Sequence, residues 1–238
     1  MTAMNWSLHP KQLLLFCDTL ATDGSDHLPR GLTTKVFVLG HLNAVICGAG
    51  LANAVSEFYG HVVANMVVKD IKHLDEFAPD IIAGIFERLI EPLPPSSDKQ
   101  PTATIYSFGW IQEEERLGGF AYRSTNDFVS ERLGYGTCVK PPTNDLSIVE
   151  QITSLEGFIE LMITQQAEDR CKARKDRLGI GGDILLYSIE VGESSAVTLQ
   201  VRSIATLPHL SSDWDIILAK LPVNANHPLT KLVLESAP

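Results

Sequence analysis

The chain has 238 residues, of which 45% are hydrophobic, and its formal net charge at neutral pH is −10. A chain of this length can bury a substantial core, and we expect one domain that spans residues 1–238. Its acidic balance and its lack of a basic stripe exclude general nucleic-acid binding and attachment to anionic membranes, because both depend on clustered Lys and Arg.

Cysteine spacing and the N-terminal sequence bound the function further. The four cysteines lie far apart, without a CxxC pair or a histidine at metal-ligand spacing: Cys17, Cys47, Cys138 and Cys171. This spacing predicts neither a disulfide framework nor a metal site, and we expect no cofactor. The N-terminus lacks the features of a signal peptide, and the longest apolar run, residues 44–55, is too short to span a bilayer. We therefore expect a cytoplasmic protein.

The first fifty residues predict two β-hairpins. The first begins at Thr2, turns at 9–11 and returns through Asp18 to Thr22, whereas the second occupies residues 35–50 and turns near Gly40. Both hairpins carry Leu, Val, Ile and Phe on both faces, which is typical of strands buried between layers. The intervening segment 22–31 is dense in turn-forming residues and predicts a loop.

Helical periodicity follows. Apolar residues recur at spacings of three and four from Leu51 to Ile71, which predicts an amphipathic helix over that range. A second helix is predicted after Asp75, with Pro79 in its first turns. The proline-rich segment 92–101 then predicts a surface connector.

The second half of the chain predicts further strands and one more helix. Strands are expected at 102–111 and 120–128, a loop at 134–144, and a strand pair at 183–191 and 196–205. A helix is expected from a capping box of Thr153 and Glu156 to about Lys175, with Gly179–Gly182 as its stop. The segment from Pro208 onward is only weakly patterned. We expect nine of the apolar residues to be buried: Phe16, Val36, Val38, Val45, Ile46, Val55, Phe58, Ile184 and Leu186.

Three polar residues stand at the ends of the predicted N-terminal strands: Thr2, Asp18 and Lys35. The sixteen residues from Thr2 to Asp18 match the spacing in proteasome β-subunits and their bacterial relatives, which are N-terminal nucleophile (Ntn) hydrolases. The seventeen residues from Asp18 to Lys35 are one more than is usual there, and the layout as a whole resembles that family. The resemblance covers residues 2–72 best and returns at 165–190. It implies a four-layer αββα sandwich, whereas the order of elements alone supports an α+β fold with layered sheets.

The chemistry of an N-terminal threonine explains why these residue types belong together. A threonine hydroxyl needs a base within reach, and its own free α-amine, with a pKa of about 8, can serve. The charge of Lys35 would keep that amine neutral, and Asp18 would hold Lys35 charged and oriented. The resemblance implies that the backbone N–H groups of Gly48, Ala49 and Gly50 meet the oxyanion. It also matches Asp176 to the late aspartate of the family.

Two positions depart from the family pattern. Tyr135 stands where an assisting serine is expected, and Gly179 replaces the serine three residues after Asp176. Each site residue also has a plainer explanation, as a terminal residue, a turn former or a solvated charge. The joint spacing of Thr2, Asp18 and Lys35 favours the catalytic interpretation.

The leading hypothesis is a threonine-type amide hydrolase that cleaves peptide or amide substrates through an acyl-enzyme on Thr2. A second is a non-catalytic assembly or interaction subunit of the same fold, and a third is a small-molecule amidase, because fold does not fix substrate. Subunits of this family form rings, so we expect a homo-oligomer. The sequence identifies neither the ring size nor an ATPase partner.

Overall fold

The computed structural model describes residues 2–23, 27–92, 101–144, 152 and 154–220. Its strands form two five-stranded antiparallel sheets and one small hairpin. The order in sheet I is β10 (Gly136–Cys138), β1 (Met4–His9), β2 (Gln12–Asp18), β11 (Asp183–Val191) and β12 (Val197–Thr206). The order in sheet II is β5 (Val36–Leu39), β6 (Ala44–Gly50), β7 (Ala103–Ile111), β8 (Arg116–Arg123) and β9 (Glu131–Arg132). The small hairpin pairs β3 (Leu20–Thr22) with β4 (Pro29–Leu32).

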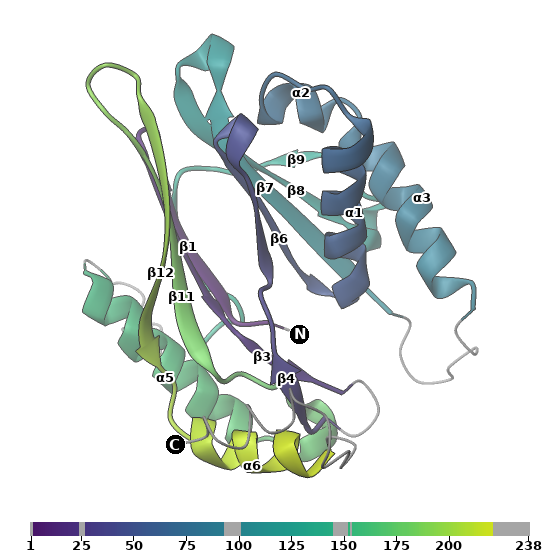
Figure 1. Ribbon diagram of the computed structural model, residues 1–238, viewed down its shortest axis with the longest axis vertical. Helices are drawn as coiled ribbons and strands as arrows, with labels where there is room; N and C mark the ends of the chain where they lie inside the picture. The colour runs from purple at the N-terminus through teal and green to yellow at the C-terminus, as the bar shows by residue number, and fades with distance from the viewer. Residues whose placement is uncertain (1, 24–26, 93–100, 145–151, 153, 221–238) are drawn as a thin grey trace, which may run out of the picture.

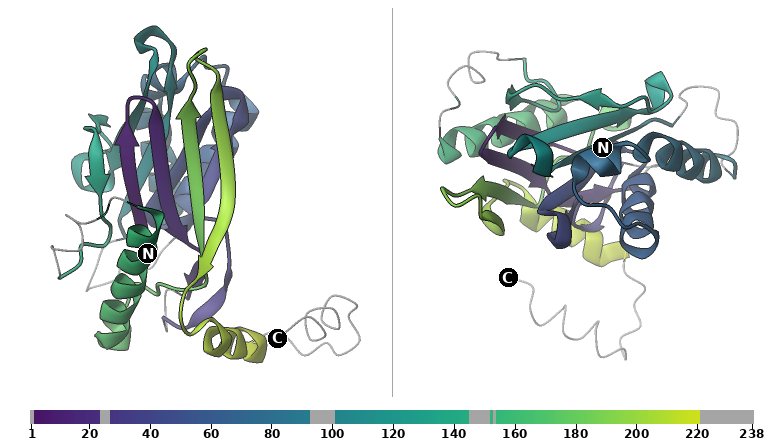
Figure 2. Two further views of the ribbon diagram at one scale, coloured as in Figure 1. Left: turned by 90° about the vertical axis from the view of Figure 1, so that its left-hand side faces the viewer. Right: turned by 90° about the horizontal axis from the view of Figure 1, so that it is seen from above.

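Helices cover the outer faces of the two sheets (Figure 1). Three of them, α1 (Ala52–Asn65), α2 (Ile71–Asp75) and α3 (Ala78–Ile90), lie over sheet II. The long helix α5 (Leu155–Cys171) crosses the lower part of sheet I, and α6 (Leu210–Lys220) lies beside β4 (Figure 2). The four-layer αββα arrangement expected from the sequence is therefore confirmed.

Three apolar clusters hold the layers together. Between the sheets, Trp6 packs against Tyr106 and Phe108, with ring centroids 5.0 and 5.4 Å apart. Under α5, Phe16 of sheet I stacks on Phe158 at 4.1 Å. Phe58 is fully buried between α1 and sheet II. Aromatic pairs at these distances add to the free energy gained by burying their area.

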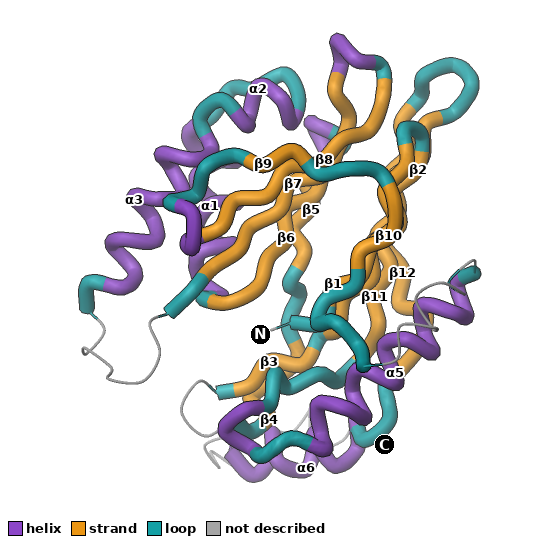
Figure 3. The backbone as a smooth tube through the Cα atoms, turned by 180° about the vertical axis from the view of Figure 1, so that it is seen from behind, coloured by secondary structure: helices purple, strands orange, loops and turns teal. Residues whose placement is uncertain are grey.

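Both N-terminal hairpins are confirmed. The pairing of β1 with β2 runs from Met4 opposite Cys17 to His9 opposite Gln12. Figure 3 shows that the start of β1 lies at the same end of the molecule as β3, β4 and α6. Eight of the nine residues expected in the core are buried, whereas Val38 is partly buried and packs against the cluster between the sheets.

Several predicted boundaries in the first half were wrong. The helix expected to reach Ile71 ends at Asn65, and α2 begins separately because the Asp70 carboxylate caps it by accepting the His73 N–H at 2.8 Å. The segment 22–31, expected as a loop, contributes the end of β3 and most of β4. Most of the proline-rich segment, residues 93–100, lies outside the described residues.

The second half also differs from expectation. The strand expected at 120–128 is β8, which starts at Arg116 and ends at Arg123, and the loop expected at 134–144 contains edge strand β10. Ser154 caps α5 by accepting the Gly157 N–H, and Thr153 lies outside the described residues. The helix ends at Cys171, well before Gly179–Gly182, so these glycines do not stop it. Helix α6 forms in the weakly patterned segment after Pro208.

Candidate active site

Asp18 fixes the segment that leads into strand β1, where Thr2 lies. Its side-chain Oδ1 accepts the backbone N–H of Ala3 at 3.0 Å, and its own N–H donates to the Ala3 carbonyl at 3.3 Å. Ala3 is fully buried, whereas Thr2 is partly exposed. The end of β2 thus sets the position of the residue that precedes β1.

The same carboxylate is paired with Lys35. The Lys35 ammonium lies 2.8 Å from Oδ1 of Asp18, and the two side chains are 10% and 0% exposed. The other oxygen, Oδ2, accepts the Gly181 N–H at 3.1 Å. Burial raises the pKa of the Asp18 carboxyl, and the Lys35 charge and the hydrogen bonds from Lys35, Gly181 and Ala3 act in the opposite direction. Asp18 and Lys35 therefore form a buried ion pair in which both carboxylate oxygens of Asp18 accept hydrogen bonds.

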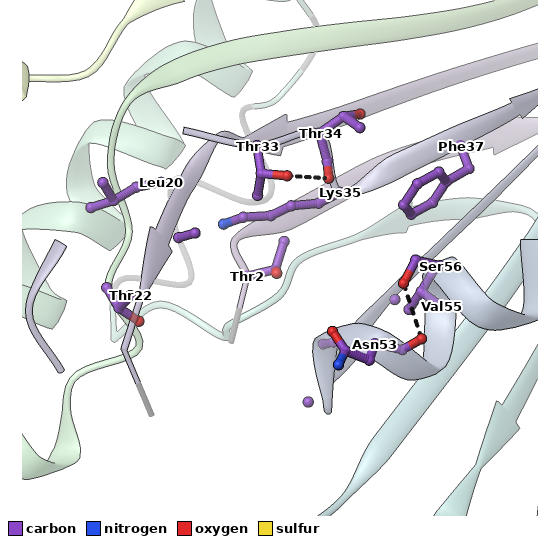
Figure 4. Close-up of a pocket in the computed structure, with 14 residues that line it drawn as sticks. Thr2, Leu20, Thr22, Thr33, Thr34, Lys35, Phe37, Asn53, Val55 and Ser56 are labelled. Carbon is purple, nitrogen blue, oxygen red and sulfur yellow. Dashed lines mark hydrogen bonds between the residues drawn. The ribbon is translucent and has the colours of Figure 1, made fainter. Parts of the chain in front are cut away.

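Thr2 and Lys35 share a cavity of about 220 Å³. Figure 4 shows the Thr2 side chain next to the extended Lys35 chain, between the β3 side and the α1 side of this cavity. Its lining comprises Thr2, Leu20, Ala21, Thr22, Thr33, Thr34, Lys35, Phe37, Gly48, Ala49, Gly50, Asn53, Val55 and Ser56. Six of the seven residues assigned to the site from the sequence therefore lie at one place: five line the cavity and Asp18 lies beneath it.

The segment Gly48–Gly50 forms one wall of the cavity. Strand β5 pairs with β6 only as far as Val36 opposite Cys47, while β6 continues to Gly50 along β7. Within the described chain, this leaves one edge of Gly48–Gly50 without a partner strand. A Cβ at Gly48 would lie 2.5 Å from the Thr104 carbonyl oxygen, and Gly50 has φ +96. Both positions therefore require glycine.

Asp176 does not join this group. It lies in a short 3₁₀ turn at Arg174–Asp176, is exposed, and is not among the described residues that line the cavity. Tyr135 is also elsewhere, because its hydroxyl donates to the Leu117 carbonyl at 2.9 Å on the sheet II side. At Gly179, with φ +75, a Cβ would lie 2.2 Å from Thr22 Cγ2, so a side chain there would displace a residue of the cavity wall.

Asp169 is a site-supporting residue that the sequence reasoning missed. Its buried carboxylate accepts the N–H groups of Leu178 at 2.7 Å and Gly179 at 2.9 Å, which shapes the loop that presents Gly181 to Asp18. The signal was present in the sequence, because Asp169 continues the buried helical stripe of α5. That stripe comprises Phe158, Leu161, Met162, Gln165, Gln166 and Asp169.

No protein-family model matches the chain, and no curated protein matches its sequence. Solved structures do match. A Gly-1 mutant of Anbu from Hyphomicrobium sp. strain MC1 is 15% identical with a TM-score of 0.56, covering 92% of this chain and 94% of that one. A helical assembly of the Anbu complex from Pseudomonas aeruginosa is 12% identical with a TM-score of 0.58, and the match covers 95% of this chain and 100% of that one. Anbu, the ancestral β-subunit, from Yersinia bercovieri is 15% identical with a TM-score of 0.54, and the match covers 99% of this chain and 92% of that one. The chain has a proteasome-like Ntn-hydrolase fold.

The family resemblance inferred from the sequence is corrected by these matches. The similar structures are Anbu proteins, which are proteasome-like but distinct from the proteasome β-subunits and bacterial relatives named above. The spacing of Thr2, Asp18 and Lys35 follows from the lengths of the first strands of the Ntn-hydrolase fold. A feature set by strand lengths cannot separate families that share the fold. At 12–15% identity the likeness shows the fold alone.

No group of three or more His, Cys, Asp or Glu side chains able to hold a metal ion occurs in the part of the chain that the structure describes. None of the helices in the described ranges combines the length and the apolar character needed to span a bilayer. All four cysteines are free, and burial raises the pKa of the Cys17 and Cys47 thiols. Both thiols pack between the two sheets as small apolar groups.

Proposed function

We propose that the chain is an amide hydrolase of the N-terminal-threonine type, a peptidase that acts through an acyl-enzyme on Thr2. The observation that carries the proposal is that Thr2 shares a cavity with Lys35, which is paired at 2.8 Å with a fully buried Asp18. A buried ion pair is costly to desolvate, and such pairs cluster at functional sites. Beside a threonine in a cavity, the cation of the pair can tune the basicity of the threonine amine.

In the proposed reaction, removal of Met1 frees the α-amine of Thr2. This amine takes the hydroxyl proton as Oγ attacks the substrate carbonyl, so that the O–C bond forms. The C–N bond then breaks, the proton passes to the leaving amine, and water hydrolyses the resulting ester. The Lys35 ammonium disfavours a second positive charge beside it, which keeps the amine neutral and basic.

The free edge of β6 supplies the remaining parts. An extended peptide can pair with the edge of Gly48–Gly50 that no strand of the described residues occupies, as an added strand does at other open sheet edges. The same backbone would offer N–H groups to the oxyanion that forms on the attacked carbonyl. Asp176 is not part of the proposed site, because it is exposed and outside the cavity lining.

We also propose a homo-oligomer. One similar structure is a helical assembly of Anbu, and this chain exposes apolar side chains on its helical layer. Val67 is 98% exposed and Phe77 46%, and both line a hollow together with Met66 and Ile81. An exposed apolar group of this kind on a monomer marks an interaction surface. A monomer at micromolar concentration in light scattering would contradict the proposal.

The test of catalysis uses protein purified after processing. Intact mass establishes whether Met1 is removed, and an electrophile selective for N-terminal threonine is then applied, with the adduct located by mass spectrometry. We expect a single adduct on Thr2 and none in Thr2→Ala. Uniform retention of Met1 in protein from its native cells, or an unlabelled Thr2 in processed protein, would favour the non-catalytic assembly subunit instead. The displaced Tyr135 and Asp176 are the observations that favour that second candidate.

A further inference from the structure

The chemistry of the cavity wall points to the side chain that the substrate carries. Among the described lining residues, Lys35 is the one with a basic or acidic side chain. Its ammonium already pairs with Asp18 at 2.8 Å, so it is not free to bind an acidic substrate side chain, and it repels a basic one. No described lining residue is therefore left to pair with an acidic or a basic substrate side chain.

An unpaired charge that enters such a cavity loses hydration without compensation. Desolvating an ion without a partner costs far more than desolvating a neutral group, so both acidic and basic side chains are disfavoured. A neutral apolar group is favoured instead, because it buries its surface against the apolar part of the wall, which comprises Phe37, Ala49 and Val55. Phe37 is itself supported by Tyr59, with ring centroids 5.0 Å apart.

The volume of the cavity limits the size of the substrate side chain that it can hold. A cavity of roughly 150 Å³ can hold a benzene ring. The volume here is about 220 Å³, which gives room for an aliphatic or aromatic side chain. Glycine at position 48 lets Val55 of the cavity wall pack closely against β6, because a Cβ there would lie 2.7 Å from Cγ2 of Val55.

Asn53 is a polar residue of the cavity wall at which a substitution can introduce a charge. It lies in the first turn of α1, is exposed, and faces the cavity in Figure 4. The hydroxyl of the neighbouring Ser56 is occupied, because it donates to the Asn53 carbonyl at 3.1 Å. Replacing the Asn53 amide by a carboxylate changes charge with almost no change in shape.

We infer that the cavity selects substrates with a neutral apolar side chain at the attacked carbonyl, and that Asn53 maintains this selectivity by being uncharged. This inference rests on the proposed function, since it concerns the residue that acylates Thr2. It assigns a specificity that the fold alone does not determine.

The experiment uses three peptide electrophiles that differ only in the residue at the reacting carbonyl: leucine, aspartate or arginine. The second-order rate of Thr2 labelling is measured for each on processed full-length protein. We expect the leucine probe to react at least about tenfold faster than the two charged probes, as the cost of desolvating an unpaired charge requires. In Asn53→Asp the labelling rate of the arginine probe, divided by that of the leucine probe, should rise by about tenfold or more, because the new carboxylate attracts the arginine. Ser56→Asp, one turn further along α1, should raise the same ratio.

Asn65→Asp is the matched control, because it makes the same change at the exposed far end of α1. Twelve residues of helix separate the two positions by about 18 Å, beyond a Debye length of about 8 Å. The control should leave the ratio unchanged. Labelling of Thr2 at equal rates by all three probes, or an unchanged ratio in both Asn53→Asp and Ser56→Asp, would overturn the selectivity while leaving the catalytic proposal intact. Processed protein that no probe labels would overturn both.

Discussion

The Lys35 ammonium lies 2.8 Å from Oδ1 of Asp18, and this same oxygen accepts the N–H of Ala3, the residue that follows Thr2. One carboxylate oxygen therefore fixes both the cation of the candidate site and the backbone that carries the nucleophile. A change at either partner alters the position of the other group. This coupling makes the ion pair the part of the site most open to experiment.

Lys35→Ala is the most direct test of the ion pair. We expect labelling of Thr2 to be abolished, because the charge that keeps the Thr2 amine neutral is lost. The free energy of unfolding should fall by about 3–5 kcal/mol, since the buried Asp18 loses its cation. Lys11→Ala, at the exposed β1–β2 turn, is the control and should leave both quantities nearly unchanged. Labelling of Lys35→Ala at the wild-type rate would disprove the constellation.

The pH dependence of stability can be traced to Glu114, at the β7–β8 turn. Its carboxylate accepts hydrogen bonds from Arg132 at 2.6 and 2.5 Å and from Arg116 at 2.8 Å. The hydrogen bonds to Arg132 are the largest cause that lowers the pKa of Glu114 from 4.5 to about 2. A lowered pKa means that this group stabilises the fold above pH 4.5 and stops doing so as the pH falls towards 2.

Glu114→Gln should therefore reduce the free energy of unfolding at neutral pH by up to about 1 kcal/mol, the range of exposed ion pairs. The difference from wild type should shrink below pH 4.5 and disappear near pH 2. Urea denaturation at a series of pH values measures it. Glu115→Gln, which removes the same charge at the next residue, is the control, and a difference that stayed constant with pH would contradict the assignment.

Phe58 tests the packing of α1 on sheet II. The side chain is fully buried among the apolar residues of that layer, so Phe58→Ala should cost about 3–5 kcal/mol of unfolding free energy. Val63, on the same helix, is 54% exposed, and Val63→Ala should change stability by less than about 0.5 kcal/mol. Chemical denaturation of the two variants gives both numbers. A cost under about 1 kcal/mol for Phe58→Ala would mean that the helix does not pack as described.

The parts of the fold that were predictable are those in which local pattern and burial agree. The two N-terminal hairpins, α3 and the β11–β12 pair carry apolar runs long enough to identify, and turn residues separate them. Strand β10 was not predictable, because three residues, Gly136–Cys138, become a strand only by pairing with β1. Helix α6 contacts β4, and its sequence carries little amphipathic signal of its own.

The candidate site was predictable in part, for a similar reason. Thr2, Asp18 and Lys35 lie at the ends of strands whose lengths are readable from sequence, so their convergence could be anticipated. Asp176 was assigned because the resemblance matches it to the late aspartate of the family, whereas Asp169 is the residue that contacts the loop. That contact depends on where α5 ends, and helix ends are the least readable feature of a sequence.

The last prediction concerns the buried amide pair of Asn5 and Gln165, which joins β1 to α5. Asn5 Nδ2 donates to Gln165 Oε1 at 2.8 Å, and Gln165 Nε2 donates back to Asn5 Oδ1 at 3.1 Å. Both side chains are almost fully buried, so water cannot replace a lost partner. Gln165→Leu should reduce the free energy of unfolding by about 1–3 kcal/mol, because Asn5 Nδ2 is then left without an acceptor. Gln200→Leu, at an exposed position of β12, is the matched control.

A double-mutant cycle of Asn5→Ala and Gln165→Ala separates this pair from its surroundings. The two residues exchange two hydrogen bonds, so we expect a coupling free energy between about 0.5 and 3 kcal/mol. Asn5 lies three residues after Thr2 in β1, and Asn5 Oδ1 also accepts the Lys140 N–H at 2.9 Å. Each single variant should therefore slow the labelling of Thr2 while leaving the intact mass of the processed protein correct. A coupling near zero, with labelling at the wild-type rate in both single variants, would show that this amide pair does not help to position the nucleophile.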